Sequence, residues 1–169
     1  MDKEFRALGV RFVFIFLLAS VHLADAQQVV FLLRHAEAVA SAEGEDPPLT
    51  EAGQRRAKAL VTLLKDVGIN VIYTSERKRA IQTAEPIANL LKIEPKRVPL
   101  RDRDSFLRGL HAQNARDRVL VVSHSLSVPY LLKALGHPVE VMIPHEEHDS
   151  VFVIFPKSDG APIVLRLHY

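Results

Sequence analysis

The sequence predicts an α/β fold, a three-layer sandwich in which helices cover both faces of a mainly parallel sheet. The main evidence is an alternation along the chain. Short apolar runs rich in β-branched residues are followed by longer segments whose apolar residues recur at helical spacing. Such an alternation needs crossover connections, which make successive strands parallel. Two later apolar runs flank Asp159-Gly160, a strong turn signal, and predict a C-terminal antiparallel hairpin.

The first strand is predicted over 29–33, where the chain is continuously apolar. A polar loop with Gly44 and two prolines follows it. Thr50 is a good N-cap for the first helix, Glu51 is favourably placed in its first turn, and Gly68 ends it. The apolar positions at helical spacing in this helix are Ala57, Leu60, Val61 and Leu64.

The middle of the chain repeats this alternation. A short strand is predicted over 71–73 and a second helix over 77–92, in which Pro86 is expected to introduce a kink. A third helix is predicted over 104–115. The apolar face of the second helix consists of Ile81, Ala84, Ala88 and Leu91.

The last part of the chain contains the clearest buried strand, over 119–122, and a helix over 128–135 that stops at Gly136. The hairpin strands are predicted over 151–155 and 163–167, as antiparallel edge strands of the same sheet.

The N-terminal residues have the pattern of a secretory signal peptide. Three basic residues precede an apolar run over 12–19, and Ala24-Asp25-Ala26 is a small-x-small cleavage site. An uncleaved membrane anchor is the alternative, but the run is shorter than the roughly 20 residues that span a bilayer. We therefore expect a signal peptide over 1–26 and a single catalytic domain over 27–169. The mature protein is expected to be periplasmic or secreted, without stable membrane association.

The composition is that of a globular protein with a hydrophobic core, with 48% hydrophobic and 25% charged residues. The net charge is +2 and the positive charges are scattered, which argues against nucleic acid as a partner. The chain has no cysteine, which excludes a thiol nucleophile and a cysteine-ligated metal cluster.

Polar side chains gather at the ends of the parallel strands. Arg34-His35 follows the first strand, Thr74-Ser75 and later Arg79 follow the second, and Ser123-His124-Ser125 follows the strand over 119–122. A parallel sheet brings such ends to one edge, where ligands bind. Guanidinium groups, helix N-termini and an imidazole at that edge predict phosphoryl chemistry.

The same segments resemble, in order, the motifs of the histidine phosphatase superfamily, the phosphoglycerate mutase-like group. By its size the chain is most similar to the small bacterial branch that includes phosphohistidine phosphatases. The matching segments are Leu33-Arg34-His35-Ala36-Glu37, Leu49-Thr50-Glu51-Ala52-Gly53, Tyr73-Thr74-Ser75 with Arg79-Ala80-Ile81-Gln82-Thr83-Ala84, and Val121-Val122-Ser123-His124-Ser125.

The resemblance implies a role for each matching residue. His35 would be the nucleophile that becomes phosphorylated, and Arg34 and Arg79 would bind the phosphoryl oxygens. His124 would hydrogen-bond the same group and stabilise the charge of the transition state. Neither a metal ion nor a cofactor is expected.

Further residues have more than one interpretation. Ser125 either donates to the phosphate or caps the following helix, and Glu37 either binds substrate and assists proton transfer or is a surface carboxylate. Arg77 is a weaker pocket candidate. Residues 54–56 are expected to be solvated, and His145-Glu146-Glu147-His148 is interpreted as an ionisable loop, because its spacing differs from a zinc motif. Candidates for the general acid, none of which can be assigned, are Asp102, Asp104, Glu146, Glu147 and Asp149.

The leading hypothesis is an exported, metal-independent phosphatase that hydrolyses phosphomonoesters or phosphoramidates through a phosphohistidine. Its partner would be a small phosphorylated substrate or a phosphoprotein. Two alternatives are a phosphoglycerate mutase-like phosphotransferase and a non-catalytic phosphate-binding module. Without a general acid, substrates with good leaving groups would be favoured over alkyl phosphates.

Overall fold

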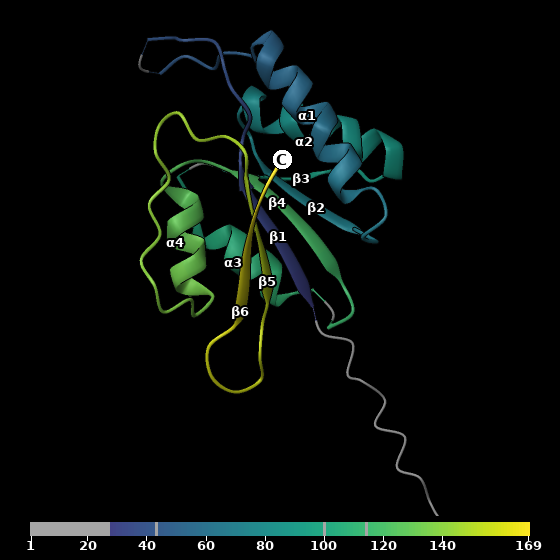
Figure 1. Cartoon of the computed structure of the whole chain (residues 1–169), viewed down its shortest axis with the longest axis vertical. Helices are drawn as coiled ribbons and strands as arrows, with labels where there is room; N and C mark the ends of the chain where they lie inside the picture. The colour runs from purple at the N-terminus through teal and green to yellow at the C-terminus, as the bar shows by residue number, and fades with distance from the viewer. Residues whose placement is uncertain (1–27, 43, 100, 114) are drawn as a thin grey trace, which may run out of the picture.

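The computed structural model describes residues 28–42, 44–99, 101–113 and 115–169, so the predicted signal peptide lies outside the described residues. One mixed sheet of six strands forms the centre, in the order β3-β2-β4-β1-β5-β6 (Figure 1). Strands β1 (Val29–Arg34), β2 (Val71–Ser75), β3 (Lys96–Val98) and β4 (Arg118–Ser123) run parallel. Strands β5 (Ser150–Phe155) and β6 (Ile163–His168) form the antiparallel hairpin, and β5 pairs with β1.

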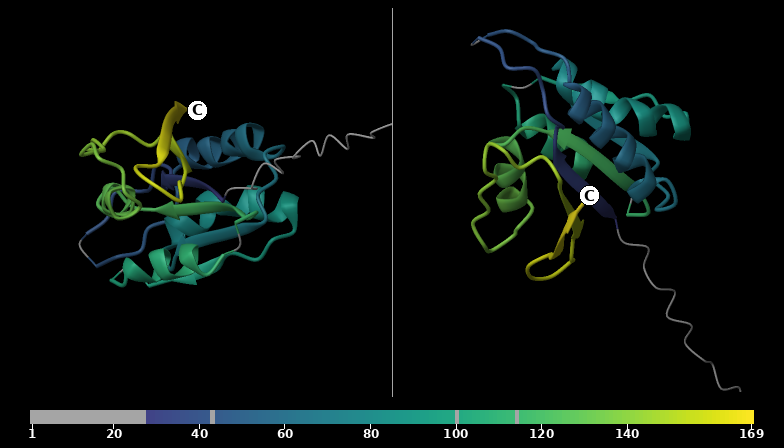
Figure 2. Two further views of the ribbon diagram at one scale, coloured as in Figure 1. Left: turned by 90° about the horizontal axis from the view of Figure 1, so that it is seen from below. Right: turned by 45° about the horizontal axis from the view of Figure 1, so that its top comes forward.

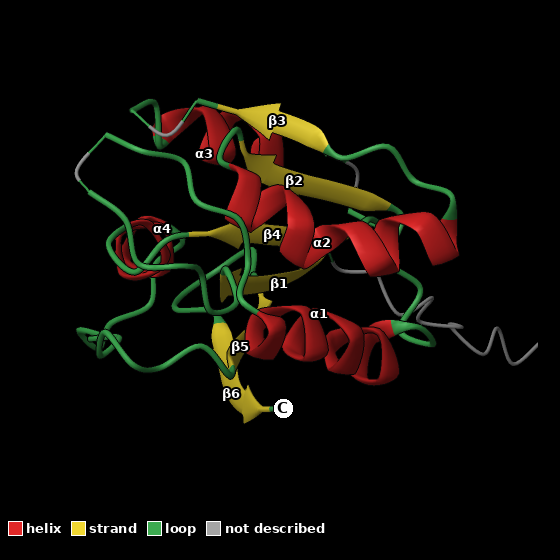
Figure 3. Cartoon of the chain, turned by 90° about the horizontal axis from the view of Figure 1, so that it is seen from above, coloured by secondary structure: helices red, strands yellow, loops and turns green. Residues whose placement is uncertain are grey.

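Four helices in the described residues cover the two faces of the sheet, as Figure 3 shows. Helices α1 (Glu51–Leu64) and α2 (Lys78–Leu91) pack on one face, against Leu33, Ile72 and Val122 among others. Helices α3 (Asp104–His111) and α4 (Ser127–Ala134) pack on the other, against Leu32 and Val121. Alternate residues of each central strand therefore enter opposite cores, which explains why these strands are continuously apolar. The predicted three-layer fold with its hairpin is confirmed.

The structure differs from the sequence-based prediction in a few elements. Strand β3 was not predicted, because it has only three residues and two of them are exposed and basic. Helix α3 ends at His111 rather than at 115. There the side-chain amide of Gln113 donates to the Gly109 carbonyl and to the Tyr73 hydroxyl, both at 2.8 Å, so the helix end is capped. Helix α2 continues through Pro86, in agreement with the single helix predicted over 77–92.

The register of the sheet places the polar strand ends side by side. Arg34 at the end of β1 is paired with Ser123 at the end of β4, and Thr74 in β2 is paired with Val122. The next amide along β1, that of His35, still donates to the Ser123 carbonyl at 2.9 Å. The views of Figure 2 show β1 in the interior of the sheet, beside β4. The residues that follow these strands are thus held on a rigid, buried frame.

Candidate active site

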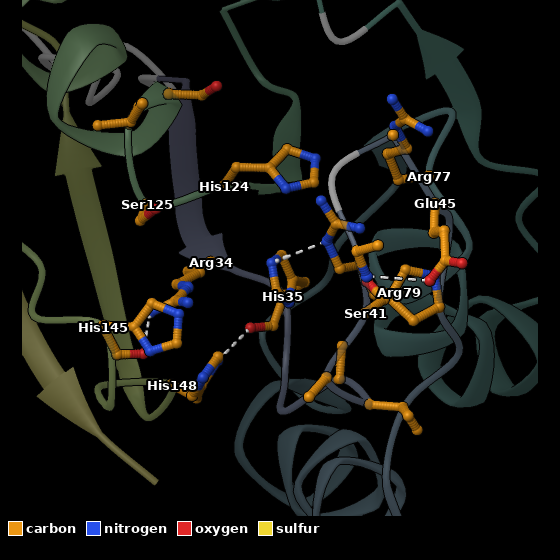
Figure 4. A pocket seen from close by; sticks show the side chains of 18 of the residues that line it. Arg34, His35, Ser41, Glu45, Arg77, Arg79, His124, Ser125, His145 and His148 are labelled. Carbon is orange, nitrogen blue, oxygen red and sulfur yellow. Dashed lines mark hydrogen bonds between the residues drawn. The ribbon is translucent and has the colours of Figure 1, made fainter.

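A cavity of about 820 Å³ opens at the carboxyl ends of β1, β2 and β4 (Figure 4). It brings together all four residues for which the resemblance implies a catalytic role, as well as Ser125. The cavity also includes the loop over 38–47 and the loop before β5. These four residues are Arg34, His35, Arg79 and His124.

His35 is buried, with 7% of its surface exposed, and both ring nitrogens have partners. Nδ1 lies 2.7 Å from the Ala36 carbonyl oxygen, which can only accept, so Nδ1 carries the proton. Nε2 is then the unprotonated nitrogen, and it accepts a hydrogen bond from Arg79 Nε at 3.2 Å. The backbone thereby fixes the tautomer that a nucleophilic Nε2 requires.

Burial lowers the pKa of His35 to about 3, although the bond to the Ala36 carbonyl opposes this shift. The neighbouring charges of His124, Arg79 and Arg34 lower the pKa further. His35 is therefore neutral at pH 7 and offers a lone pair on Nε2.

His124 faces His35, with the two ring centroids 5.1 Å apart. Its Nε2 lies 2.7 Å from the Ser75 hydroxyl, which also accepts from the Arg77 amide at 3.3 Å. The Ser75 hydroxyl can donate to Nε2 or accept from it, so this contact fixes the orientation of the His124 ring without fixing its tautomer. Burial, followed by the charges of Arg79, Arg77 and Arg34, lowers the pKa of His124 to about 3. Ser75 thus orients His124, a role that its place in a strand-end motif did not reveal.

The two arginines that are expected to bind the phosphoryl oxygens, Arg34 and Arg79, have different surroundings. Arg79 lies at the start of α2 against His35, and its NH1 group is 3.9 Å from an Asp46 carboxylate oxygen. Arg34 is buried, and its NH1 group donates to three carbonyls of the loop before β5, at 2.8 to 3.1 Å. Arg34 Nε is buried without a partner in the described part of the chain. Arg34 therefore fixes the 144–147 loop beside the site in addition to lining the cavity.

His148 is a site residue that the sequence analysis missed. Its Nδ1 donates to the His35 carbonyl oxygen at 2.8 Å, and the two rings are 5.7 Å apart. Burial lowers the pKa of His148, although the bond to the His35 carbonyl opposes this shift. Both His145 and His148 line the cavity, so this segment is part of the site and not merely an ionisable loop. The contact spans 113 residues, which no local pattern could reveal.

The expected binding role of Glu37 is not supported. Its side chain does not line the cavity, and its carboxylate accepts from Nε and NH2 of Arg56 at 2.7 to 2.9 Å. That hydrogen bond holds the pKa of Glu37 below its usual range. Arg56, which was expected to be solvated, has a side chain only 27% exposed and also donates to the Tyr169 carbonyl. Glu37 is thus a structural ion-pair partner that anchors the segment after His35.

Two other ambiguous residues line the cavity. Ser125 does so directly before α4, whose N-cap, Leu126, makes no side-chain capping bond. The structure therefore gives no support to the capping interpretation of Ser125. Arg77 also lines the cavity, and its Nε is buried without a partner among the described residues.

The carboxylates considered as general acids all lie outside the residues that line the cavity. Asp102 is bound to Ser105 and Arg108, Asp104 to the Tyr130 hydroxyl, and Asp149 to His168. Glu147 is bound to Ser150 and Arg166, and the side chain of Glu146 is 87% exposed. Among described residues the lining carboxylate is that of Glu45, whose side chain accepts from the Ala42 amide at 3.0 Å.

Over 28–42, 44–99, 101–113 and 115–169, no group of three or more metal-ligating side chains is placed to hold an ion. In the same ranges no helix is long and apolar enough to cross a bilayer.

The buried neutral histidines predict acid sensitivity. Unfolded histidine has a pKa near 6.5, whereas His35 and His124 in the fold have pKa values of about 3. Their folded pKa is depressed, so stability is complete above the unfolded pKa and is lost as the pH falls below it. Between pH 7 and pH 5 the two together should lower the free energy of unfolding by about 4 kcal/mol. Urea unfolding at both pH values measures this, and His124→Asn should remove about half of the difference. Equal stability of the wild type at both pH values would contradict it.

The chain matches a known family in sequence and several solved structures in fold. The family model described as the histidine phosphatase superfamily (branch 1) matches residues 30–104. Among solved structures, a putative phosphohistidine phosphatase SixA from Agrobacterium tumefaciens is 22% identical, with a TM-score of 0.66 over 83% of this chain and 98% of that chain. The protein histidine phosphatase SixA complexed with tungstate is 24% identical, with a TM-score of 0.67 over 83% of this chain and 96% of that chain.

A putative alpha-ribazole-5'-P phosphatase from Escherichia coli K-12 is 18% identical, with a TM-score of 0.67 over 85% of this chain and 97% of that chain. At these identities the structural likeness shows the fold. The family model covers β1, α1, β2, α2 and β3, which include Arg34, His35 and Arg79. The fold comparison extends over β4 and the hairpin that complete the same architecture.

Proposed function

Because this chain belongs to the histidine phosphatase superfamily and is a phosphatase, we propose that it hydrolyses phosphomonoesters or phosphoramidates through a phosphohistidine formed on His35. One observation supports this most strongly. A neutral, buried imidazole presents an unprotonated Nε2 beside a guanidinium group, in a cavity of about 820 Å³. No metal ion takes part in the proposed chemistry.

In the first step, His35 Nε2 attacks phosphorus in line with the leaving group. The nitrogen–phosphorus bond forms as the bond to the leaving oxygen or nitrogen breaks, and the leaving group takes up a proton from solvent water. Nδ1–H stays bonded to the Ala36 carbonyl, which stabilises the positive charge that spreads over the ring. In the second step, water attacks the phosphohistidine, inorganic phosphate leaves, and Nε2 regains its lone pair.

Arg79 is proposed to change its partner during this cycle. In the structure its Nε donates to the lone pair of His35 Nε2, which is the pair needed for attack. A bound phosphoryl group offers anionic oxygens, which are better acceptors than a neutral imidazole. Arg79 would then turn to the substrate, free Nε2 for attack and stabilise the equatorial oxygens, together with the His124 ring that Ser75 orients.

The substrate class follows from the leaving group. The carboxylates first considered as acids lie outside the cavity lining, and Glu45, the lining carboxylate among the described residues, is exposed. Aryl phosphates and phosphoramidates need less proton donation than alkyl phosphates, so they are the proposed substrates. Of the similar structures, one bears the name putative phosphohistidine phosphatase and another the name protein histidine phosphatase, and the bond to phosphorus in phosphohistidine is a phosphoramidate bond.

Export is part of the proposal. It is supported by the basic start, the apolar run over 12–19 and the cleavage site Ala24-Asp25-Ala26. The protein would then act in the periplasm or outside the cell, on a small phosphorylated molecule or a phosphoprotein.

One experiment tests export and activity together. The full chain is expressed in a Gram-negative host, and the protein is purified from the periplasmic fraction and weighed by mass spectrometry. A mass for 27–169 is expected, and retention of residues 1–26 would refute signal cleavage. The same protein is assayed in EDTA with phosphoramidate, phenyl phosphate and glycerol 1-phosphate.

We expect kcat/KM for the first two substrates to exceed that for the alkyl ester by about 100-fold or more. A quenched reaction should contain an acid-labile, alkali-stable phosphoryl adduct. Activity that disappears in EDTA would refute the metal-free mechanism. If phosphate raises the melting temperature but no substrate turns over, the chain is a binding module instead.

A further inference from the structure

Three more arginines line the cavity besides Arg34 and Arg79. Arg77 precedes α2, and Arg101 and Arg103 lie in the segment between β3 and α3. The described lining therefore contains five arginines and a single carboxylate, that of Glu45. The positive charge of Arg77 lowers the pKa of both Arg79 and His124, so the extra charge acts on the catalytic groups.

These three guanidinium groups lack the close carboxylate partners that Arg56, Arg108 and Arg166 have. Arg56, Arg108 and Arg166 each make an ion pair of 2.7 Å or less. In the described part of the chain no carboxylate lies within ion-pair distance of Arg77, Arg101 or Arg103. Of the acids beside Arg101 and Arg103 in the sequence, Asp102 is bound by Arg108 and Ser105, and Asp104 by the Tyr130 hydroxyl.

Two of the three are also held in a way that prepares them for an anion. Nε of Arg77 is buried without a partner, which leaves a desolvated donor at the cavity wall. Arg103 stacks on the Tyr130 ring, with its guanidinium carbon 4.8 Å from the ring centroid. A stacked guanidinium keeps its edge N–H groups free for hydrogen bonds to oxygen atoms.

A single phosphoryl group at His35 does not account for this charge. It would be bound by Arg79 and His124, with Arg34 beside it, which leaves the other three arginines without a counter-ion. Like charges gathered in a cleft repel one another and attract anionic ligands. A cavity of about 820 Å³ is within the size range of small-molecule sites and exceeds what one phosphate fills.

The geometry points to a second anion subsite formed by Arg77, Arg101 and Arg103, and thus to a small phosphorylated substrate that carries a second phosphate or carboxylate group. This inference rests on the proposed function for the position of the reacting phosphate. The second anion takes no part in bond breaking. It orients the substrate so that its reacting phosphorus lies at His35.

The test measures binding, so it does not depend on turnover. Alkylene bisphosphonates with one to four methylene groups are compared with ethylphosphonate by calorimetry, at a fixed 150 mM salt. Two equivalent ends give a bisphosphonate a twofold statistical advantage. The best spacing should bind about tenfold or more tighter than the monophosphonate, because a second charge-assisted contact is made. Replacing one end by a carboxylate shows which second anion the subsite prefers.

The double variant Arg101→Gln/Arg103→Gln should lose at least about fivefold of this preference. Arg97→Gln, an exposed arginine in β3 outside the cavity, is the control and should retain the preference. Urea unfolding of each variant verifies that the fold is intact. A preference of twofold or less in the wild type, or one that survives in the double variant, overturns the second subsite.

Catalytic failure gives a different result. If the substrates of the activity assay are not hydrolysed but the bisphosphonate preference is present and lost in the double variant, the subsite stands and the proposed function fails. If hydrolysis occurs without the preference, the proposed function stands and the subsite fails.

Discussion

Replacement of His35 by alanine is expected to lower kcat for phenyl phosphate by about 10⁴-fold or more, because the proposed covalent route has no other nucleophile. The side chain is buried, and its Nε2 is the neutral nitrogen that faces Arg79. Removal of the imidazole leaves the arginines in place, so the KM should change far less than kcat. Steady-state assays of both proteins measure the two constants separately.

The control for this variant is His111→Ala. His111 is exposed at the end of α3, outside the cavity, so it tests loss of a histidine without loss of the nucleophile. It should retain wild-type activity. The acid-labile adduct should be present in the wild type and in His111→Ala and absent in His35→Ala. Turnover by His35→Ala within tenfold of the wild type would exclude His35 as the nucleophile.

Replacement of Gly53 by alanine is expected to destabilise the fold by about 3 kcal/mol or more, because the new methyl group would overlap backbone atoms. A Cβ at this position would lie 2.1 Å from the Glu37 carbonyl oxygen and 3.0 Å from its carbon. Neither can move freely, because the Thr50 amide donates to this carbonyl and the Glu37 side chain is bound to Arg56. Urea unfolding at pH 7 measures the loss.

The expected loss of stability in Gly53→Ala is opposite in sign to the effect at an ordinary helix position, where alanine is more favourable than glycine by about 1 kcal/mol. The neighbouring exposed residue provides the matched control. Ala52→Gly should cost only about that amount, since no close approach is involved there. The folded fraction of Gly53→Ala should also have reduced activity, because the new methyl group displaces Glu37 and residues 36–38 follow His35 directly. Unchanged or increased stability of Gly53→Ala would contradict the close packing of α1 against this segment.

Much of the fold could be predicted because its information is local. A continuous apolar run predicts a strand that is buried on both faces. Thr50 predicts a helix start, and its hydroxyl oxygen does accept a hydrogen bond from the Gly53 amide at 3.0 Å. Strand β3 has too few residues to form a pattern, and pairing with β2 is what makes it a strand. The end of α3 depends on Gln113, whose amide donates both to Gly109 of the same helix and to Tyr73 of β2, and the second acceptor is distant in sequence.

The candidate site divides in the same way. Arg34, His35, Arg79 and His124 could be named from motifs, because each follows or closely follows a strand whose place in the sheet is implied by the alternation of elements. Their roles in catalysis remain predictions for the variants above. The partner of Glu37 could not be named, because the sequence does not show whether a carboxylate turns toward a cavity or toward an arginine 19 residues away.

The sequence by itself therefore determined the α/β class, the order of its main strands and helices, and the identity of the motifs at the strand ends, since each is encoded in a short run of residues. Only the tertiary structure decided the tautomer of His35 and the orientation of His124 by Ser75. It also decided the contact of His148 with the His35 carbonyl and the excess of arginines over carboxylates in the described cavity lining. The physical reason is that hydrogen bonds, desolvation and charge depend on distance in space. The chain brings these groups together only when the sheet has formed.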